Sequence, residues 1–88
     1  MEFEYDPVKS ERNAQKHGID FEEAEELWLD DGLVLLASAY AQENRYLAIG
    51  QIDNVHWTAI FTERGDRTRI ISVRRSRSEE KALYERNK

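Results

Sequence analysis

The residues best suited to chemistry lie in the last third of the chain, over residues 61–75. The segment reads Phe-Thr-Glu-Arg-Gly-Asp-Arg-Thr-Arg-Ile-Ile-Ser-Val-Arg-Arg. Its apolar stretches predict two strands joined by a tight turn at Gly65, with Glu63 and Arg64 before the turn and Arg74 and Arg75 at the far end. Arginine stays charged and presents a planar fork of donors that fits a phosphate group. The segment therefore predicts a phosphate-handling site at the rim of a small sheet.

A carboxylate beside such arginines can act as a general base. In RNA cleavage a base removes the proton of the 2′-hydroxyl, and an arginine stabilises the charge that develops on the phosphorane. No metal is needed for this step, because the nucleophile belongs to the substrate. On this interpretation Glu63 is the base and Arg64 is the cation. The alternative is a polar hairpin turn whose charges are only solvated.

Arg74 and Arg75 are neighbours in the predicted strand, so their side chains point to opposite faces. Strict alternation places Arg74 with Ile70 and Ser72, and Arg75 with Arg69, Ile71 and Val73 on the side that helices are expected to cover. This favours Arg74 for function and keeps Arg75 as the alternative.

His17 is a further candidate, since an imidazole can protonate the leaving 5′-oxygen near neutral pH. It stands at the end of a predicted helix, where it can equally serve the helix dipole.

The composition limits the class of protein. A chain of 88 residues is expected to form one domain over residues 1–88. It has no cysteine, which excludes disulfides and thiolate metal sites and favours a cytoplasmic location. His17 and His56 lack ligand spacing, and no glycine-rich phosphate loop is present, so no metal or cofactor is expected. No apolar run is long enough to span a membrane.

The charge is unevenly distributed along the chain. Residues 1–43 carry three basic and twelve acidic residues, a net charge of −9. Residues 44–88 carry ten basic and six acidic residues, a net charge of +4, which gives −5 for the whole chain. The C-terminal half can therefore meet nucleic acid or an acidic partner, although a solvated surface of uneven charge explains the same pattern.

Periodicity and capping signals predict the elements that position these residues. Residues 2–5 alternate as a short strand, and Asp6-Pro7 starts a helix that ends near His17 and Gly18. Lys9, Asn13 and Lys16 share one face of this helix. An Asp20–Glu23 capping box starts a second helix, which ends at residues 31–32.

Four strands follow, over residues 33–40, 45–52, 55–62 and 68–75, with a hairpin turn at Asp53-Asn54. A capping box formed by Ser76 and Glu79 then starts a helix that runs to about Arg86. The order β-α-α-β-β-β-β-α predicts an α+β fold with a twisted antiparallel sheet and helices packed on one face. Trp28, Tyr46, Trp57 and Phe61 are expected in the core, and His56 is expected to be structural.

Several motifs in sequence order resemble the BrnT toxins of type II toxin–antitoxin systems. The residues that carry the resemblance are 3–9 (Phe-Glu-Tyr-Asp-Pro-Val-Lys), 13–19 (Asn-Ala-Gln-Lys-His-Gly-Ile), 21–24, 45–50, 61–65, 69–75, Glu80 and Tyr84. The resemblance covers nearly the whole chain.

The resemblance implies a RelE-like fold and a metal-independent endoribonuclease that cleaves mRNA and arrests growth. It implies catalytic roles for Lys9, Glu63, Arg64 and one of Arg74 or Arg75. It also implies a BrnA-like antitoxin with a ribbon-helix-helix domain, through which alone the toxin would reach operator DNA. The alternative is a non-catalytic module on the same fold that binds another protein through its acidic helix face.

Overall fold

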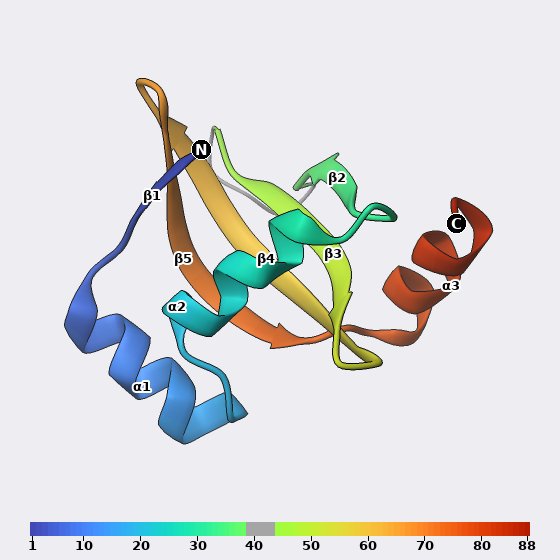
Figure 1. Ribbon diagram of the computed structural model, residues 1–88, viewed down its shortest axis with the longest axis horizontal. Helices are drawn as coiled ribbons and strands as arrows, with labels where there is room; N and C mark the ends of the chain where they lie inside the picture. Colours follow the sequence, from blue (N-terminus) through green and yellow to red (C-terminus); the bar gives the residue numbers. More distant parts are fainter. Residues whose placement is uncertain (39–43) are drawn as a thin grey trace.

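A computed structural model describes residues 1–38 and 44–88 of the chain. Figure 1 shows a strongly twisted sheet with helices around it. The elements are β1 (Glu2–Glu4), α1 (Pro7–His17), α2 (Phe21–Ala24), the 3-10 helix η1 (Glu25–Leu29), β2 (Val34–Ala37), β3 (Tyr46–Ile52), β4 (Val55–Arg64), β5 (Arg67–Arg75) and α3 (Ser78–Arg86). The second predicted helix is thus a short α-helix that tightens into a 3-10 helix. The strand predicted over residues 33–40 corresponds to β2, and its predicted end at Tyr40 lies outside the described residues.

Local capping and turn signals are confirmed. The Asp6 carboxylate accepts a hydrogen bond from the Val8 N–H at 2.9 Å at the start of α1, and Gly18 ends that helix with a φ of 82°. Asp20 and Glu23 form the expected capping box on α2. Asp53 and Asn54 have φ values of 51° and 68°, as a two-residue hairpin turn with two left-handed positions requires.

The start of α3 differs from the prediction by one residue. The N-cap is Arg77, and the Glu80 carboxylate accepts a hydrogen bond from the Arg77 N–H at 2.8 Å. Ser76 does not cap the helix, because its hydroxyl is hydrogen-bonded to the Thr58 hydroxyl at 2.8 Å. Its N–H donates to the His56 carbonyl, which continues the pairing beyond β5. This shift makes Glu80, rather than Glu79, the carboxylate that turns back to the sheet.

The sheet is mixed, with the strand order β1-β5-β4-β3-β2. The strands β2 to β5 pair antiparallel, as expected from their short connections. The prediction of a wholly antiparallel sheet is wrong, because β1 pairs parallel to β5, with Glu2 beside Arg67 and Glu4 beside Arg69. No hairpin constrains β1, since α1, α2 and η1 separate it from the next strand.

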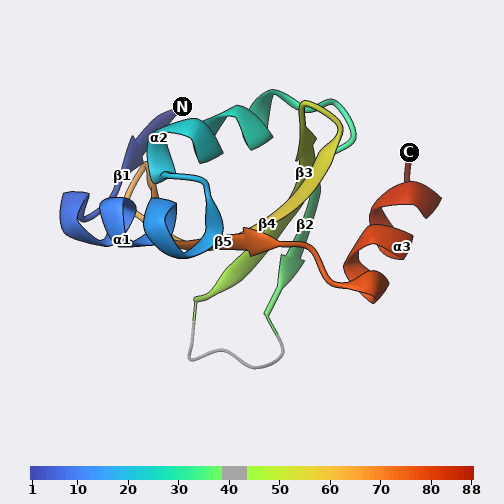
Figure 2. The ribbon, with the colours of Figure 1, turned by 90° about the horizontal axis from the view of Figure 1, so that it is seen from below.

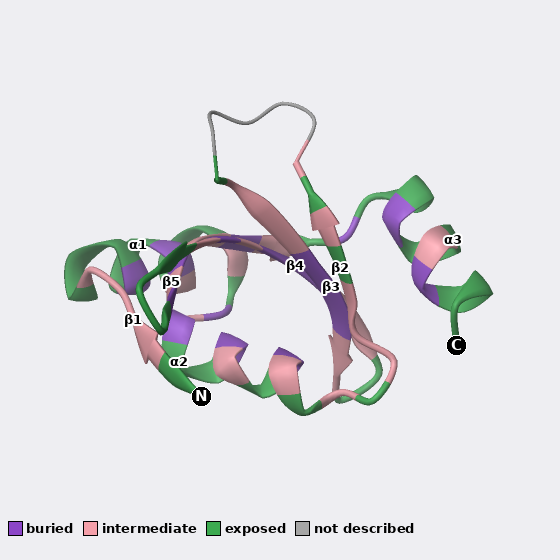
Figure 3. Cartoon of the chain, turned by 90° about the horizontal axis from the view of Figure 1, so that it is seen from above, coloured by how far each residue is buried: buried purple, intermediate pink, exposed green. Residues whose placement is uncertain are grey.

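Helices lie on both sides of the sheet, which corrects the prediction that all of them pack on one face. Figures 2 and 3 show α1 and α2 on one side and α3 on the other. The α2 side holds the buried core, in which Phe21, Ala24 and Leu27 meet Trp57 and Phe61. Trp28 and Tyr46 pack against this core, so the expected placement of the four aromatic residues is confirmed. On the other side, α3 packs on β3 and β4 through Tyr84 and Glu80.

A β-bulge changes the facing of side chains in β5. Ile60 pairs with Ser72 but Phe61 pairs with Ile70, so Ile71 is an extra residue in β5. Ile70 and Val73 therefore both face the core, with exposures of 2% and 0%. The predicted alternation, which placed Ile71 with Val73 and Ile70 with Arg74, is wrong at this point.

The inner face of α1 is polar, and Asn13 attaches it to the sheet. The Asn13 side chain donates to the Val73 carbonyl at 2.9 Å and accepts from the Val73 N–H at 3.1 Å. The Asn13 side chain thereby satisfies the backbone N–H and carbonyl of Val73 at the edge of β5, beyond the end of β1, as a neighbouring strand would. Asn13 is buried, whereas Lys9 and Lys16, predicted on the same face, are exposed.

Candidate functional site

The candidate residues predicted from the sequence lie on both faces of the sheet. We call the face that α3 partly covers the α3 face; it carries Thr58, Ile60, Thr62 and Arg64 of β4 together with Ser72 and Arg74 of β5. Glu63 and Arg75 belong to the opposite face, with Phe61 and Trp57. The predicted combination of Glu63 with Arg64 is therefore not brought together on one face.

Arg74 is held by α3 through a two-pronged ion pair. Its Nη1 and Nη2 atoms each lie 2.8 Å from one carboxylate oxygen of Glu80. The side chains are 20% and 10% exposed, so the pair is largely removed from water. Arg74 is thus not a freely projecting cation, because α3 covers the end of the face on which it stands.

Glu80 collects further donors at the same point. It accepts hydrogen bonds from the Thr58 hydroxyl at 2.9 Å and from the Arg77 N–H at 2.8 Å, and the Thr58 hydroxyl also bonds Ser76. Burial opposes ionisation of Glu80, but the hydrogen bonds from Arg74, Arg77 and Thr58 outweigh it and lower its pKa to about 2. The hydrogen bond with Glu80 in turn raises the pKa of Arg74. Both groups are therefore charged at neutral pH.

A second group of arginines surrounds Glu4 at the other end of the α3 face. The Glu4 carboxylate lies 2.9 Å from Arg69, 3.5 Å from Arg64 and 3.9 Å from Arg67. Arg67 also lies 3.3 Å from Glu2. Sequence reasoning singled out only Arg64 here. The spacing of arginines around Gly65 could have indicated Arg67 and Arg69, but Glu4 depends on the parallel pairing of β1.

The remaining candidates lie on or beside the opposite face. The Arg75 guanidinium stands 5.2 Å from the centre of the Trp57 ring, and the residue is exposed, past the edge of the core. Lys9 is exposed on α1, and His17 is half-buried in its last turn. Glu63 is exposed, lies 3.4 Å from the Thr68 hydroxyl and borders a 370 Å³ cavity with Tyr46 and Phe61. Among the described residues, no hydrogen bond or ion pair joins Lys9, His17 or Glu63 to a candidate arginine.

His56, expected to be structural, has partners that fit that role. Its Nε2 atom lies 2.9 Å from Glu85 and 3.3 Å from Gln51, and its ring meets the edge of Tyr84. These contacts attach the C-terminal half of α3 to the sheet.

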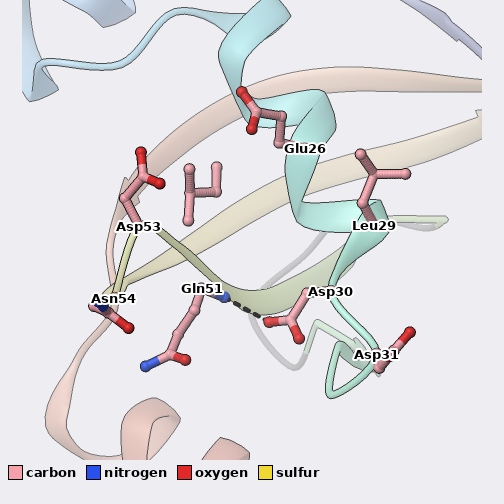
Figure 4. A pocket seen from close by; sticks show the side chains of 8 residues that line it. Glu26, Leu29, Asp30, Asp31, Gln51, Asp53 and Asn54 are labelled. Atoms are coloured by element: carbon pink, nitrogen blue, oxygen red, sulfur yellow. Dashed lines mark hydrogen bonds between the residues drawn. The ribbon is translucent and has the colours of Figure 1, made fainter.

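A pocket between η1 and the β3–β4 turn is acidic. Its volume is 590 Å³, and Figure 4 shows the side chains of Glu26, Asp30, Asp31 and Asp53 around it. Burial alone would raise the pKa of Asp30, but hydrogen bonds from Tyr84, Gln51 and Gly32 lower it. Its described lining contains no basic residue, so the field there repels phosphate. No group of three or more histidine or acidic side chains in residues 1–38 and 44–88 has an arrangement that could hold a metal ion.

Two further observations bear on the class of protein. None of the helices over the described residues is long and apolar enough to cross a membrane. No curated protein matches the sequence.

A family model described as "Ribonuclease toxin, BrnT, of type II toxin-antitoxin system" matches residues 5–80. This range includes α1, the whole of β2 to β5 and the Glu80 that holds Arg74. The match covers far more than half of the 88 residues, so the chain belongs to the BrnT family of ribonuclease toxins of type II toxin–antitoxin systems.

Proposed function

We propose that the protein is a metal-independent endoribonuclease with a RelE-like fold that cleaves mRNA and so arrests growth. The observation that carries this proposal is the arrangement of arginines on the α3 face of a BrnT-family chain. Arg74 stands at one end of this face and Arg64, with Arg67 and Arg69, stands at the other. A surface with cations at both ends suits the backbone of an RNA strand.

The two ends serve different phosphates. Arg74 pairs with Thr58 of β4, and Arg64 lies six residues further along that strand, roughly 20 Å away at about 3.3 Å per residue. One phosphate cannot touch both. We assign the scissile phosphate to Arg74, because its fixed guanidinium is already oriented and would stabilise developing charge without reorganisation. Arg64 then binds a neighbouring part of the strand.

Proton transfer is assigned to residues beyond the α3 face. Glu63 is exposed at the rim where β4 turns into β5, five residues along β4 from the Thr58 that pairs with Arg74, roughly 17 Å at about 3.3 Å per residue. It is proposed as the general base for a scissile phosphate held at the Arg64 end, because a base must lie within hydrogen-bond reach of the proton that it removes. Lys9 and His17 are proposed to assist, and His17 would protonate the leaving oxygen. Arg75 is the alternative to Arg74. Arg74 and Glu63 therefore mark alternative positions of the scissile phosphate, and the Glu63→Gln variant distinguishes them.

The first experiment measures RNA cleavage by the purified, antitoxin-free protein with and without EDTA. Cleavage is expected in both, since the nucleophile is the 2′-hydroxyl. Arg74→Lys keeps a positive charge beside Glu80 but loses the fork, and we expect cleavage to fall by about 10²–10³-fold. Arg12→Lys, at an exposed position of α1, is the matched control and should cleave normally. Full activity of Arg74→Lys would show that Arg74 does not bind the scissile phosphate.

The second experiment replaces Glu63 by Gln, which preserves shape but cannot accept the proton. Cleavage should fall by about 10²–10⁴-fold if Glu63 is the base. Arg64→Ala should chiefly weaken RNA binding. Unchanged cleavage by Glu63→Gln would make Glu63 a turn residue, and Lys9 would be tested next.

A family member of this kind has a cognate antitoxin. We propose that this antitoxin is BrnA-like, with a ribbon-helix-helix domain, that operator DNA is contacted only through it, and that the toxin acts in the cytoplasm. A non-catalytic protein-binding role remains the second candidate. It is favoured by the acidic pocket and by Leu29 at its border, which is 81% exposed. Cleavage of RNA by the free protein decides between the two.

A further inference from the structure

Arg74 has hydrogen-bonding capacity that its described contacts do not use. A guanidinium carries five N–H donors. At Arg74, Nη1 donates to Glu80 and, at 3.3 Å, to the Arg75 carbonyl, while Nη2 donates once, to Glu80. The Nε–H and the second Nη2–H have no partner among the described residues. These two donors form the side edge of the guanidinium, which can grip a second oxyanion with two parallel hydrogen bonds.

The Nε–H on this side edge is not fully buried. In the described part of the chain, no buried side-chain nitrogen or oxygen lacks a hydrogen-bond partner, so an unpaired Nε–H of Arg74 cannot be buried. Arg74 borders a 480 Å³ pocket between α3 and the sheet, together with Ser38, Leu47, Ile60, Arg77 and Glu80. The volume is within the range of small-molecule sites, which begins at about 300 Å³.

The lining of this pocket matches the parts of a nucleotide. Leu47 and Ile60 supply an apolar surface for a base or ribose. Arg77 is exposed and adds a second cation beside Arg74, and the described residues form no ion pair with it. With Glu80 the lining carries two positive charges and one negative charge, and Glu79 borders the adjoining pocket beside Arg77. The attraction for a phosphate therefore comes from the two guanidinium groups themselves. The acidic pocket around Asp30 has no basic residue in its described lining and therefore offers no such phosphate site.

We propose that this pocket is a nucleotide subsite of the RNA-binding surface, in which the side edge of Arg74 and the guanidinium of Arg77 hold one phosphate. Glu80 is the positioning residue: it binds the Nη1 and Nη2 atoms at the end of the Arg74 guanidinium and leaves the side edge free. The inference rests on the proposed ribonuclease function and deepens it, since it names Arg77 and Glu80 as parts of the substrate site. An acidic protein segment is the competing occupant, and the test separates the two.

The test follows the Arg74 Nε–H signal by NMR while a 2′-O-methyl RNA oligonucleotide, which cannot be cleaved, is added to the full chain. We expect a saturable shift of this signal. Arg77→Gln should weaken binding about tenfold and lower the salt slope by about 0.7, as expected when a single-strand phosphate contact is lost. Arg86→Gln, on the same helix but away from the pocket lining, is the matched control and should bind as the native chain does.

Glu80→Gln tests positioning separately from folding. It should reduce the Arg74 Nε–H shift at saturation, even under conditions where unfolding measurements show the variant to be folded. A purely structural Glu80 would lower stability but leave the shift of the bound state unchanged. That result would overturn the positioning role.

The outcomes distinguish this inference from the proposed function. Oligonucleotide binding with no effect of Arg77→Gln overturns the subsite alone. Binding without any shift of Arg74 overturns the subsite and also the assignment of the scissile phosphate to Arg74, whereas cleavage of unmodified RNA by the same protein would still support the ribonuclease. A shift of Arg74 in a protein that does not cleave unmodified RNA supports the subsite and refutes the enzyme. If poly-glutamate shifts Arg74 and displaces the oligonucleotide at equal concentration, the pocket belongs to an acidic partner and the proposal is overturned.

Discussion

Replacing Glu80 by Gln should remove one pH-dependent contribution to the free energy of unfolding. The pKa of Glu80 falls from an ordinary value of 4.5 to about 2 in the folded chain. A carboxyl whose folded pKa is depressed stabilises the fold above its unfolded pKa and loses this contribution as the pH falls toward the folded value. The contribution is therefore complete above about pH 5 and mostly lost by pH 2. Allowing for solvent screening, the shift corresponds to about 2–3 kcal/mol.

The assay is urea unfolding followed by the fluorescence of Trp28 and Trp57, at several pH values from 2 to 7, on native protein and Glu80→Gln. The native protein should be more stable by about 2–3 kcal/mol at pH 7, and the difference should shrink toward zero near pH 2. Other carboxylates, including Asp30, titrate in both proteins and cancel in the difference. Glu79→Gln, at the exposed neighbour in the first turn of α3, should show no such trend. A difference that stays constant from pH 7 to pH 2 would refute the ionised Glu80–Arg74 pair.

Two other predictions follow from the fold and the charge distribution. Asn13→Ala should lower the free energy of unfolding by about 2–4 kcal/mol, because it leaves the buried N–H and carbonyl of Val73 and the Ile19 carbonyl without their partner; a loss below about 1 kcal/mol in urea unfolding would contradict this role. Association with the cognate antitoxin should slow more than tenfold from low to high salt in stopped-flow measurements, because acidic antitoxin side chains would be attracted to Arg64 and Arg74, and the complex should not cleave RNA. A flat salt series would rule out electrostatic capture, and an RNA-active complex would rule out occlusion of the site.

The features that could be predicted from the sequence depend on neighbours within a few residues. The Asp6 cap, the Gly18 helix end and the Asp53-Asn54 turn each follow from local backbone chemistry, and each is confirmed. The core placement of Trp57 and Phe61 follows from strand alternation in β4, which has no bulge. The mixture of helices and strands was also predictable, because each type has its own hydrophobic period.

The features that could not be predicted depend on residues far apart in the chain. The bulge at Ile71 shifts the facing of β5 without any glycine or proline to indicate it. Asn13 bonds a residue 60 positions away, and Glu4 meets arginines of β4 and β5 only because β1 pairs parallel to β5. The polar inner face of α1 is explained by the Asn13 contact with β5.

The position of α3 changes how mutations at Arg74 must be interpreted. The sequence places Arg74 on an uncovered sheet face, where its removal would affect only substrate. In the structure, Arg74→Ala leaves the largely buried Glu80 without its counter-charge, which is a destabilising change in itself. Loss of toxicity in that variant would therefore not distinguish a missing phosphate ligand from a displaced α3. Arg74→Lys retains the charge beside Glu80 and removes the fork, so a folded but inactive lysine variant is the result that ties the guanidinium to RNA.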